Sequence, residues 1–433
     1  MSSPPGAPFA GLLTDRYELT MLRAALADGT AGRHAVFEVF TRRLPAGRRF
    51  GVVAGTARIL DAIDRFRFTD RDLTFLRAGG VLDDRTTQYL AGWRFGGDID
   101  GYAEGELYFP GSPVLTVSGS FADCVILETL LLSVLNHDCA VAAGAARMVV
   151  AAGNRPVIEM GSRRTHERAA VASARAAYLV GFAATSNLAA GAAYGIPTTG
   201  TAAHAFTLLH DSEAEAFRAQ IAALGVGTTL LVDTYDITAG IRNAIEVAGT
   251  SLGGIRIDSG DLAVHAHAGR RQLDDLGARA TQIVLSGDLD EHALAALGAA
   301  PVDAYGVGTA VVTGSGAPTA GLVYKLVEVD GRPVAKRAFD KASVGGRKLA
   351  VRRHRPTGTA TAEVLALGGA PTDEDGDRIL QLPLIRAGQP VAAATLDQSR
   401  IHHRQVMITL PWDGLKLSPG EPALPTEMQA AGS

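Results

Sequence analysis

The middle of the chain repeats one pattern of hydrophobic and polar positions. A short apolar run ends in a cluster of Gly, Ser, Thr, Asp or His, and a stretch with helical spacing follows it. The apolar runs span residues 155–160, 182–184, 196–199, 229–232, 254–257, 282–285 and 302–305. Buried parallel strands are nearly continuous apolar runs, and the helices between them cover the sheet. The pattern therefore predicts a parallel α/β sheet, either open or closed into a barrel.

The polar clusters of this region come directly after the predicted strands. In parallel α/β proteins the loops that follow the strands converge on one face, where active sites are built. The clusters are Gly161–Arg164, Thr185–Asn187, Gly200–His204, Asp233–Asp236, Asp258–Asp261, Ser286–Asp288 and Gly306–Thr309. Because so many reactive side chains share one face, we expect an enzyme.

The two ends of the chain show other patterns. A helix is predicted over residues 17–27, and strands are predicted within 35–40 and 98–117. Near the other end, residues 321–338 read as a hairpin around the turn Asp330-Gly331, and further short strands are expected up to Leu410.

We therefore predict an irregular parallel α/β barrel, similar to a TIM barrel, beside a second, smaller, β-rich α+β domain built from both chain ends. The barrel is assigned to residues 121–324 and the second domain to residues 1–120 and 325–415. Residues 416–433 are rich in Pro and Gly from Ser418 onward, and we expect this tail to be disordered.

Composition narrows the functional classes. The 433 residues are 47% hydrophobic and 20% charged, which is typical of a soluble globular protein. With 41 basic and 45 acidic residues the net charge is −4, so neither nucleic acid nor an anionic membrane is the expected partner. The most apolar stretch, residues 125–135, is too short to span a bilayer and contains Glu128.

Localisation and redox state follow from two further observations. Residues 1–10 lack the basic and apolar regions of a secretory signal peptide, which predicts a cytoplasmic protein. The two cysteines, Cys124 and Cys139, have no metal-binding spacing and are expected to be buried free thiols.

Nine motifs closely resemble those of nicotinate phosphoribosyltransferases, the actinobacterial enzymes in particular. The first runs from Leu12 to Met21 and reads Leu-Leu-Thr-Asp-Arg-Tyr-Glu-Leu-Thr-Met. The others, in family order, are Phe37–Phe40, Gly161–Arg164, Gly181–Asn187, Gly200–Phe206, Asp233–Asp236, Arg256–Asp261, Gly306–Thr309 and Gly321–Lys325. No single motif is decisive, but nine in order are specific.

The resemblance implies a type II phosphoribosyltransferase of the ATP-dependent ligase class. Such an enzyme forms nicotinate mononucleotide and diphosphate from nicotinate and 5-phosphoribosyl 1-pyrophosphate (PRPP) in NAD salvage. The family uses Mg²⁺, and it couples synthesis to ATP hydrolysis through a phosphohistidine. It is usually a homodimer whose active sites lie near the subunit interface.

His204 matches the family's phosphohistidine. A lone histidine among alanines is more often packed in a core. Its position after a predicted strand, within Gly200-Thr-Ala-Ala-His204, favours the catalytic role. A neutral imidazole nitrogen is nucleophilic near neutral pH. We expect a carboxylate to hold the other ring nitrogen, and Glu159 is the candidate by analogy.

Five residues match the family's nicotinate site. The resemblance implies that the Tyr17 ring stacks on the pyridine, with Met160 on the opposite face in place of the usual aromatic residue. Arg256 and Thr201 are the implied contacts to the nicotinate. Ser186 stands where related nicotinamide enzymes carry an aspartate, which favours the acid over the amide.

Phosphate binding is predicted on the same face. Glycine turns let backbone N–H groups approach a phosphate, and guanidinium groups pair with its oxygens. The residues expected to bind phosphate or PRPP are Arg163, with Arg164 beside it, Ser286, Gly287, Gly308, Thr309 and Arg42. Arg42 begins a basic loop that a purely solvated role would explain equally well.

Acidic residues on this face have two explanations. Asp at a strand–helix junction is frequently a helix N-cap. Alternatively, Asp258 is catalytic and stabilises the positive charge that develops on the ribose. Asp233 and Asp236 are weaker candidates for this chemistry. Mg²⁺ is expected to arrive with PRPP, with Asp258 or Asp261 as candidate ligands.

Other functions stay open from the sequence alone. The base could be nicotinamide or quinolinate, although the His204 motif argues against quinolinate. The chain could also be a non-catalytic nucleotide sensor, or a different barrel enzyme acting on sugar phosphates. Tyr17, His204 and Arg256 are all present, which favours the transferase.

Overall fold

The repeating pattern in the middle of the chain folds as a six-stranded parallel sheet, seen in a computed structural model that describes residues 11–336, 344–369, 376–391 and 394–429. The sheet belongs to unit 2, residues 144–316, and the rest of the chain forms unit 1. Its strand order is β7-β6-β11-β10-β9-β8. The bounds are β6 Val157–Glu159, β7 Ala184–Thr185, β8 Thr229–Leu231, β9 Gly254–Ile257, β10 Gln282–Ser286 and β11 Ala304–Val307.

This sheet corrects the barrel prediction. Strands β7 and β8 form its two edges and, within the described residues, do not pair with each other, so the sheet is an open half-barrel. The predicted strand at 196–199 is reduced to one bridge between Thr185 and Thr198. The fold class, α/β with a parallel sheet, is confirmed.

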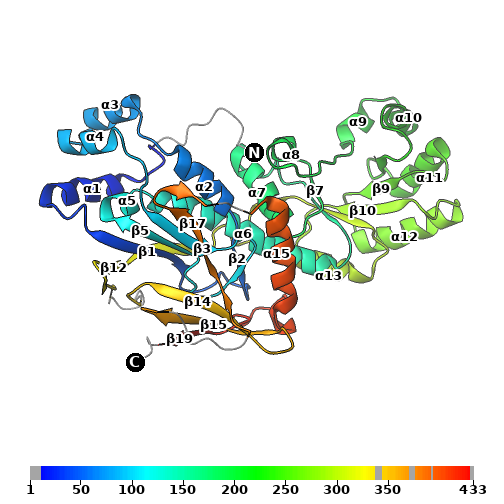
Figure 1. Cartoon of the computed structure of the whole chain (residues 1–433). Coiled ribbons are helices and arrows are strands. Elements are labelled where there is room, and N and C mark those ends of the chain that lie inside the picture. The colour runs from blue at the N-terminus through cyan, green and yellow to red at the C-terminus, as the bar shows by residue number, and fades with distance from the viewer. Residues whose placement is uncertain (1–10, 337–343, 370–375, 392–393, 430–433) are drawn as a thin grey trace. The chain divides into compact units, whose positions relative to one another are not determined.

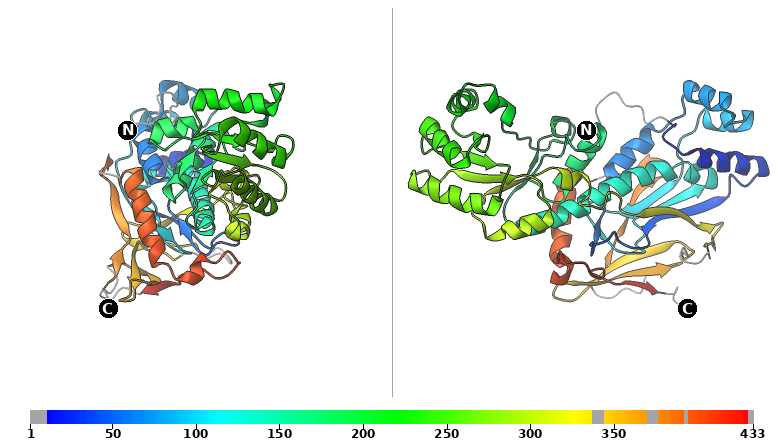
Figure 2. Two further views of the ribbon diagram at one scale, coloured as in Figure 1. Left: turned by 90° about the vertical axis from the view of Figure 1, so that its right-hand side faces the viewer. Right: turned by 180° about the vertical axis from the view of Figure 1, so that it is seen from behind.

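The helices of unit 2 alternate with these strands. They are α7 Glu167–Leu179, α8 Leu188–Tyr194, α9 His204–Leu208, α10 Glu213–Leu224, α11 Ile237–Ala248, α12 Leu262–Asp275, α13 Glu291–Ala296, η1 Leu297–Ala299 and α14 Thr309–Val312. Helices α10, α11 and α12 follow one another along the sheet (Figure 1, Figure 2). Their N-caps are Ser212, Asp236 and Asp261, whose side chains accept backbone N–H groups of the first turn.

Unit 1 comprises residues 1–143 and 317–433, so it is the longer of the two units. Its main sheet has the order β13-β12-β1-β5-β3-β17-β18, and all neighbours are antiparallel. The bounds are β1 His34–Thr41, β3 Asp98–Tyr102, β5 Leu115–Ser120, β12 Leu322–Val329, β13 Arg332–Pro333, β17 Gln381–Arg386 and β18 Gln389–Pro390. Pairing of β12 with β13 confirms the predicted hairpin, of which Arg337 and Ala338 lie outside the described residues.

Within the described residues, unit 1 also contains two smaller sheets, seven helices and the first part of helix α6, Glu128–Ala152. The four-stranded sheet has the order β16-β14-β15-β19, with bounds β14 Lys348–His354, β15 Ala360–Leu367, β16 Arg378–Ile379 and β19 Thr426–Gln429. Strand β2 Gly51–Val52 pairs with β4 Leu107–Tyr108. The helices are α1 Arg16–Asp28, α2 Thr56–Arg65, α3 Asp70–Ala78, α4 Asp84–Leu90, α5 Phe121–Val125, α15 Leu396–Thr409 and η2 Trp412–Leu415.

The C-terminal part of unit 1 overturns two predictions. Residues 396–409 form helix α15 and not strands, and a capping box between Thr395 and Gln398 starts this helix. The tail predicted to be disordered contributes β19, which pairs in parallel with β15. Leu424 in the tail is buried. Residues 430–433 lie outside the described residues.

Helix α6, Glu128–Ala152, contains most of the apolar stretch at residues 125–135 and continues well beyond it. The boundary between the two units falls within this helix. By length and composition alone, α6 could cross a membrane, but 72% of its most apolar window is buried inside the structure. Such burial is typical of a core helix. The cysteine prediction is confirmed, since Cys124 and Cys139 are buried free thiols.

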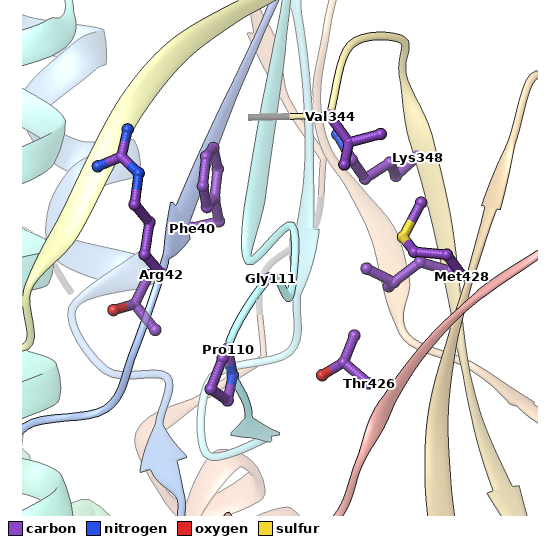
Figure 3. Close-up of a pocket in the computed structure, with 10 residues that line it drawn as sticks. Phe40, Arg42, Pro110, Gly111, Val344, Lys348, Thr426 and Met428 are labelled. Atoms are coloured by element: carbon purple, nitrogen blue, oxygen red, sulfur yellow. The ribbon is translucent and has the colours of Figure 1, made fainter. Parts of the chain in front are cut away.

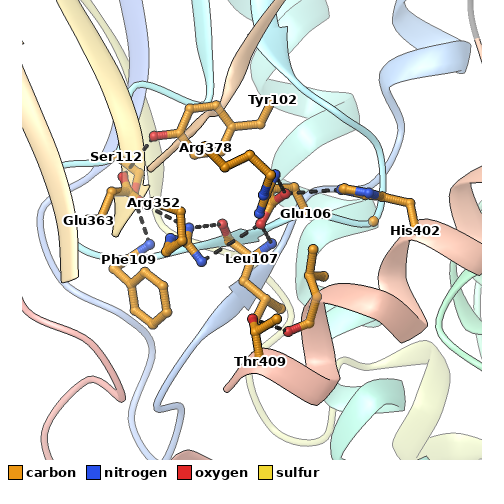
Figure 4. A network of polar contacts seen from close by, with 12 residues as sticks. Tyr102, Glu106, Leu107, Phe109, Ser112, Arg352, Glu363, Arg378, His402 and Thr409 are labelled. Carbon is orange, nitrogen blue, oxygen red and sulfur yellow. Dashed lines mark hydrogen bonds and ion pairs between the residues drawn. The ribbon is translucent and has the colours of Figure 1, made fainter. Parts of the chain in front are cut away.

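A buried ion network ties the small sheets of unit 1 together (Figure 4). Arg352 on β14 donates to Glu363 on β15 at 2.8 Å and to the Leu107 carbonyl at 2.9 Å. The Tyr102 hydroxyl donates to the other oxygen of Glu363 at 2.7 Å. Glu106 lies 3.7 Å from the Arg352 guanidinium. Neither Arg352 nor Glu363 is exposed to solvent by more than 1%.

Candidate active site

The carboxyl ends of β8, β9 and β10 bring three predicted residues together. The parallel register places Arg256 beside Leu231 on one side and Val284 on the other. Residues that follow these strands therefore emerge at the same edge of the sheet. Asp258 and Ser286 both contact Arg256 there, and Asp233 contacts the backbone of Asp258.

The Arg256 guanidinium is the centre of this edge. Its Nε donates to Ser286 Oγ at 2.7 Å, one terminal nitrogen to Thr201 Oγ1 at 3.1 Å, and the other to Asp258 Oδ1 at 2.8 Å. An arginine has five N–H groups, so three bonds leave one N–H free on each terminal nitrogen. This arrangement suits the two oxygens of a carboxylate.

Asp258 is ionised at neutral pH. Burial opposes its charge, but hydrogen bonds from Ser286 and Arg256, with the Arg256 and His204 charges, lower its pKa below the ordinary value. A fixed negative charge at this edge can stabilise a cationic centre that forms beside it.

His204 begins helix α9, where both ring nitrogens face unit 2 side chains. Its Nδ1 lies 3.1 Å from Thr234 Oγ1, and its Nε2 lies 3.8 Å from Asp233 Oδ1. Asp233 Oδ1 is buried and has no hydrogen-bond partner in the structure. Asp233 Oδ2 accepts from the Asp258 backbone at 2.9 Å and from Ser259 Oγ at 2.7 Å. The carboxylate nearest to His204 is therefore Asp233, held in place through one oxygen.

Glu159 does not hold His204, which corrects the assignment by analogy. Its carboxylate instead accepts from the Gly161 backbone and from Thr185 Oγ1. Its backbone carbonyl accepts from Ser186 at 2.8 Å. The buried Glu159, whose pKa burial raises, thus joins the loops that follow β6 and β7. No feature of the sequence around Glu159 distinguishes this bracing role from a role at the histidine.

Met160 and Gly306 lie next to Ser286. A Cβ at Gly306 would lie 2.7 Å from the Met160 sulfur and 3.2 Å from Ser286 Cβ. Only glycine at this position lets the thioether cross strand β11. The apolar Met160 side chain therefore lies next to Ser286, and Ser286 contacts Arg256.

The predicted phosphate residues occupy the remaining strand ends. Gly287 has φ +109°, and a Cβ there would lie 2.3 Å from the Asp258 carbonyl oxygen, so this turn requires glycine. Gly308 precedes the short helix α14, whose first residue, Thr309, is exposed. Arg163 and Arg164 are exposed on the loop after β6. These groups share the face that carries Arg256.

The structure supports the capping explanation for two aspartates. Asp236 caps α11 by accepting from Ala239 N at 2.8 Å, and Asp261 caps α12 by accepting from Val264 N at 3.2 Å. No group of three or more His, Cys, Asp or Glu side chains in the described part of the chain could hold a metal ion.

Tyr17 lies in unit 1, in the first turn of α1, and is 45% exposed. Burial and the neighbouring charges of Glu128 and Glu18 raise its pKa, so the hydroxyl stays protonated. Glu18 has no exposed surface and accepts from Thr129 N at 2.9 Å. It also bonds the Thr129 and Thr14 hydroxyls.

Glu18 should make stability depend on pH. Burial raises its pKa from 4.5 to about 7, so the folded state binds its proton more tightly than the unfolded state. Its contribution is fully present below pH 4.5 and is lost as pH rises through 7. Glu18→Gln, which mimics the protonated form, should gain roughly 2–3 kcal/mol relative to the wild type between pH 5 and pH 8. Denaturant unfolding at both pH values measures this difference, and a constant difference would contradict it.

Arg42, also in unit 1, lines a cavity of about 340 Å³ between β1 and the four-stranded sheet (Figure 3). The other lining residues are Phe40, Thr41, Pro110, Gly111, Val344, Lys348, Leu365, Thr426 and Met428. The Arg42 guanidinium carbon lies 5.9 Å from the centre of the Phe40 ring. Its Nε is buried and has no hydrogen-bond partner in the structure.

Sequence comparisons agree with the motifs. The family model for the nicotinate phosphoribosyltransferase (NAPRTase) N-terminal domain matches residues 12–136. The chain is 64% identical to nicotinate phosphoribosyltransferase pncB1 of Mycobacterium tuberculosis, covering 96% of this chain and 95% of that protein. It is 38% identical to nicotinate phosphoribosyltransferase of Bacillus subtilis, covering 79% of this chain and 72% of that protein.

Solved structures show the same fold. Human nicotinic acid phosphoribosyltransferase superposes with a TM-score of 0.82 at 26% identity, covering 96% of this chain and 97% of that chain. Nicotinate-nucleotide pyrophosphorylase from Pyrococcus furiosus superposes with a TM-score of 0.77 at 24% identity, covering 92% and 96%. The similarity therefore extends over both units.

Proposed function

The chain belongs to the nicotinate phosphoribosyltransferase family, and we propose that it forms nicotinate mononucleotide and diphosphate from nicotinate and PRPP in NAD salvage, with ATP hydrolysis coupled through His204. The observation that carries this proposal is the Arg256 guanidinium, held at three positions with two N–H groups left for a carboxylate.

Nicotinate is the base that this site suits best. Its carboxylate pairs with Arg256, while the ring lies near the Met160 thioether. The stacking role of Tyr17 is carried over from the family resemblance. Ser186 offers a hydroxyl and no negative charge to this acid. An aspartate there would repel the carboxylate and favour an amide.

Transfer of the ribosyl group requires alignment and charge stabilisation. The pyridine nitrogen attacks C1 of the ribose as diphosphate leaves, through a state in which positive charge develops on the sugar. Ionised Asp258 stabilises that charge. Gly287, Gly308, Thr309 and Arg163 bind the phosphates. Mg²⁺ enters bound to the diphosphate of PRPP, where it would neutralise the leaving group.

His204 accepts the phosphoryl group of ATP. Asp233, whose buried Oδ1 faces Nε2 at 3.8 Å, orients the ring and stabilises the positive charge that the ring gains when its other nitrogen bonds to the phosphoryl group and ADP leaves. Asp233→Asn keeps the shape and removes the charge. Phosphoryl transfer to His204 should therefore slow in this variant.

The enzyme acts as a cytoplasmic homodimer with active sites near the interface. In support, Leu208 and Leu209 at the end of α9 are 62% and 77% exposed, and Leu188 at the start of α8 is 75% exposed. Large exposed apolar side chains are typical of an interface. Light scattering of the purified protein measures the dimer.

Product formation tests the reaction. PRPP and Mg²⁺ are supplied with nicotinate, nicotinamide or quinolinate, each with and without ATP. We expect a mononucleotide product with nicotinate and with neither of the other two bases. The yield of nicotinate mononucleotide should be higher when ATP is present. Turnover of another base would assign a sister activity, and no turnover would favour a nucleotide sensor.

Arg256→Ala should raise the KM for nicotinate by about 30–100-fold, because a charged hydrogen-bonding partner contributes roughly 2–3 kcal/mol. The KM for ATP should stay within about threefold. Arg256→Lys keeps the positive charge but loses the two parallel N–H groups of the guanidinium, so its nicotinate KM should lie between those of the wild type and Arg256→Ala. The exposed Arg218→Ala on α10 is the matched control. An unchanged nicotinate KM in Arg256→Ala would overturn the assignment.

A further inference from the structure

Glu18 is a fully buried carboxylate in the first family motif, and the reaction described above does not use it. A buried carboxylate is costly unless hydrogen bonds satisfy it. Its bonds to Thr129 join the start of α1 to the start of α6, and its bond to Thr14 is local to the start of α1. It accepts from the Thr129 backbone at 2.9 Å and bonds the hydroxyls of Thr129 and Thr14.

A glutamate at this position of a helix usually caps its own helix and does not contact another one. Glu18 is the third residue of α1, where a glutamate commonly bonds back to the N-cap in a capping box. Here the N-cap, Asp15, makes no side-chain cap bond, and Glu18 reaches across to another helix. The first turn of α1 is therefore fixed by a tertiary contact and not by its own cap.

This contact determines what surrounds Tyr17. Tyr17 precedes Glu18, and Glu128 precedes Thr129, so the bond between Glu18 and Thr129 sets Tyr17 beside Glu128. The Glu128 carboxylate is in turn 3.9 Å from the Lys325 ammonium of β12. Lys325 ends the Gly321–Lys325 motif, for which the reaction has no other use.

We propose that Glu18 is a positioning residue that fixes the Tyr17 ring for nicotinate by holding the start of α1 against the start of α6. The proposal rests on the proposed role of Tyr17 in stacking on the pyridine. A ring on an exposed first turn samples several directions unless its backbone is held, and restricting it removes that cost from binding. Loss of this contact should therefore weaken the binding of nicotinate and leave the binding of PRPP and ATP unchanged.

The test compares Glu18→Ala with Glu18→Gln in steady-state kinetics. Glu18→Ala should raise the nicotinate KM about tenfold, with the KM values for PRPP and ATP within twofold of wild type. Glu18→Gln should stay within about threefold, because its amide can accept from Thr129 and donate to Thr14. The exposed Thr20→Ala on the same helix is the matched control.

A second pair of variants separates this proposal from the role of Tyr17. Tyr17→Ala should raise the nicotinate KM, and Glu18→Ala should add little in the Tyr17→Ala background. If Tyr17→Ala leaves the nicotinate KM unchanged, the stacking role fails. If Tyr17→Ala raises it but Glu18→Ala does not, only the positioning role fails. An equal rise in the KM values for nicotinate, PRPP and ATP in Glu18→Ala would also overturn the positioning role. Should Glu18→Ala not fold, Thr129→Val provides the same comparison, with a rise of about threefold expected.

Discussion

His204→Ala is expected to lower the ATP-stimulated rate by about 100-fold or more, the scale of removing a reacting group. ATP hydrolysis and phosphoryl labelling of the protein should both disappear, because alanine offers no nitrogen to accept the phosphoryl group. Slow ATP-independent synthesis should remain, since Arg256 and Asp258 still bind and stabilise the reacting groups. Rates with and without ATP, together with labelling from γ-labelled ATP, measure these effects.

The matched control for this experiment is His267→Ala. His267 is an exposed histidine on α12 in the same unit. Its replacement should leave ATP stimulation within about twofold of wild type. Full ATP stimulation in His204→Ala would refute the phosphohistidine, whereas loss of stimulation in both variants would point to general damage.

Arg352→Ala is expected to destabilise the protein by about 3–5 kcal/mol, because it leaves buried acids without their cation. Glu363 would keep only the Tyr102 hydroxyl among the partners described above, in a position with no exposed surface. Burial already raises the pKa of Glu363 against the attraction of Arg352, so its protonated form would be favoured in the variant. Denaturant unfolding measures the loss.

A double variant tests the cause of this loss. Arg352→Met with Glu363→Gln removes both charges and keeps similar volumes, so it should be clearly more stable than Arg352→Ala. Glu106 retains Arg378 at 2.7 Å and His402 at 3.0 Å in either case. If the double variant is as unstable as Arg352→Ala, loss of the cation–π contact between Arg352 and Phe109, 5.0 Å from guanidinium carbon to ring centre, explains the effect and unpaired charge does not.

The sequence predicted the parallel strands well where they are simple apolar runs. Strand β9 was predicted over residues 254–257 and has those bounds, because both its faces are covered. Strand β11 was predicted too early, at 302–305, and runs from Ala304 to Val307. The predicted loop begins at Gly306, but Gly306 lies within β11, and its lack of a side chain leaves room for the Met160 sulfur.

The site was predicted at the level of residues and not of pairings. The Arg256 side chain is hydrogen-bonded to Thr201, Asp258 and Ser286. These residues lie at or just after the carboxyl ends of the predicted strands, which are expected to share one edge of the sheet. The partner of His204 was misassigned, since sequence spacing does not say which strand ends adjoin. Helix α15 was missed because its apolar residues are few, and only its capping box marks it.

The strand order of unit 1 has a consequence for synthesis on the ribosome. Strand β1 pairs with β5, which follows early, and with β12, which is translated only after the whole of unit 2. Unit 2 is contiguous in sequence, so all its strands are available once residue 316 has emerged. Nascent chains should therefore complete the half-barrel while one edge of β1 still awaits its partner, and this edge is the point at which two nascent chains could pair wrongly.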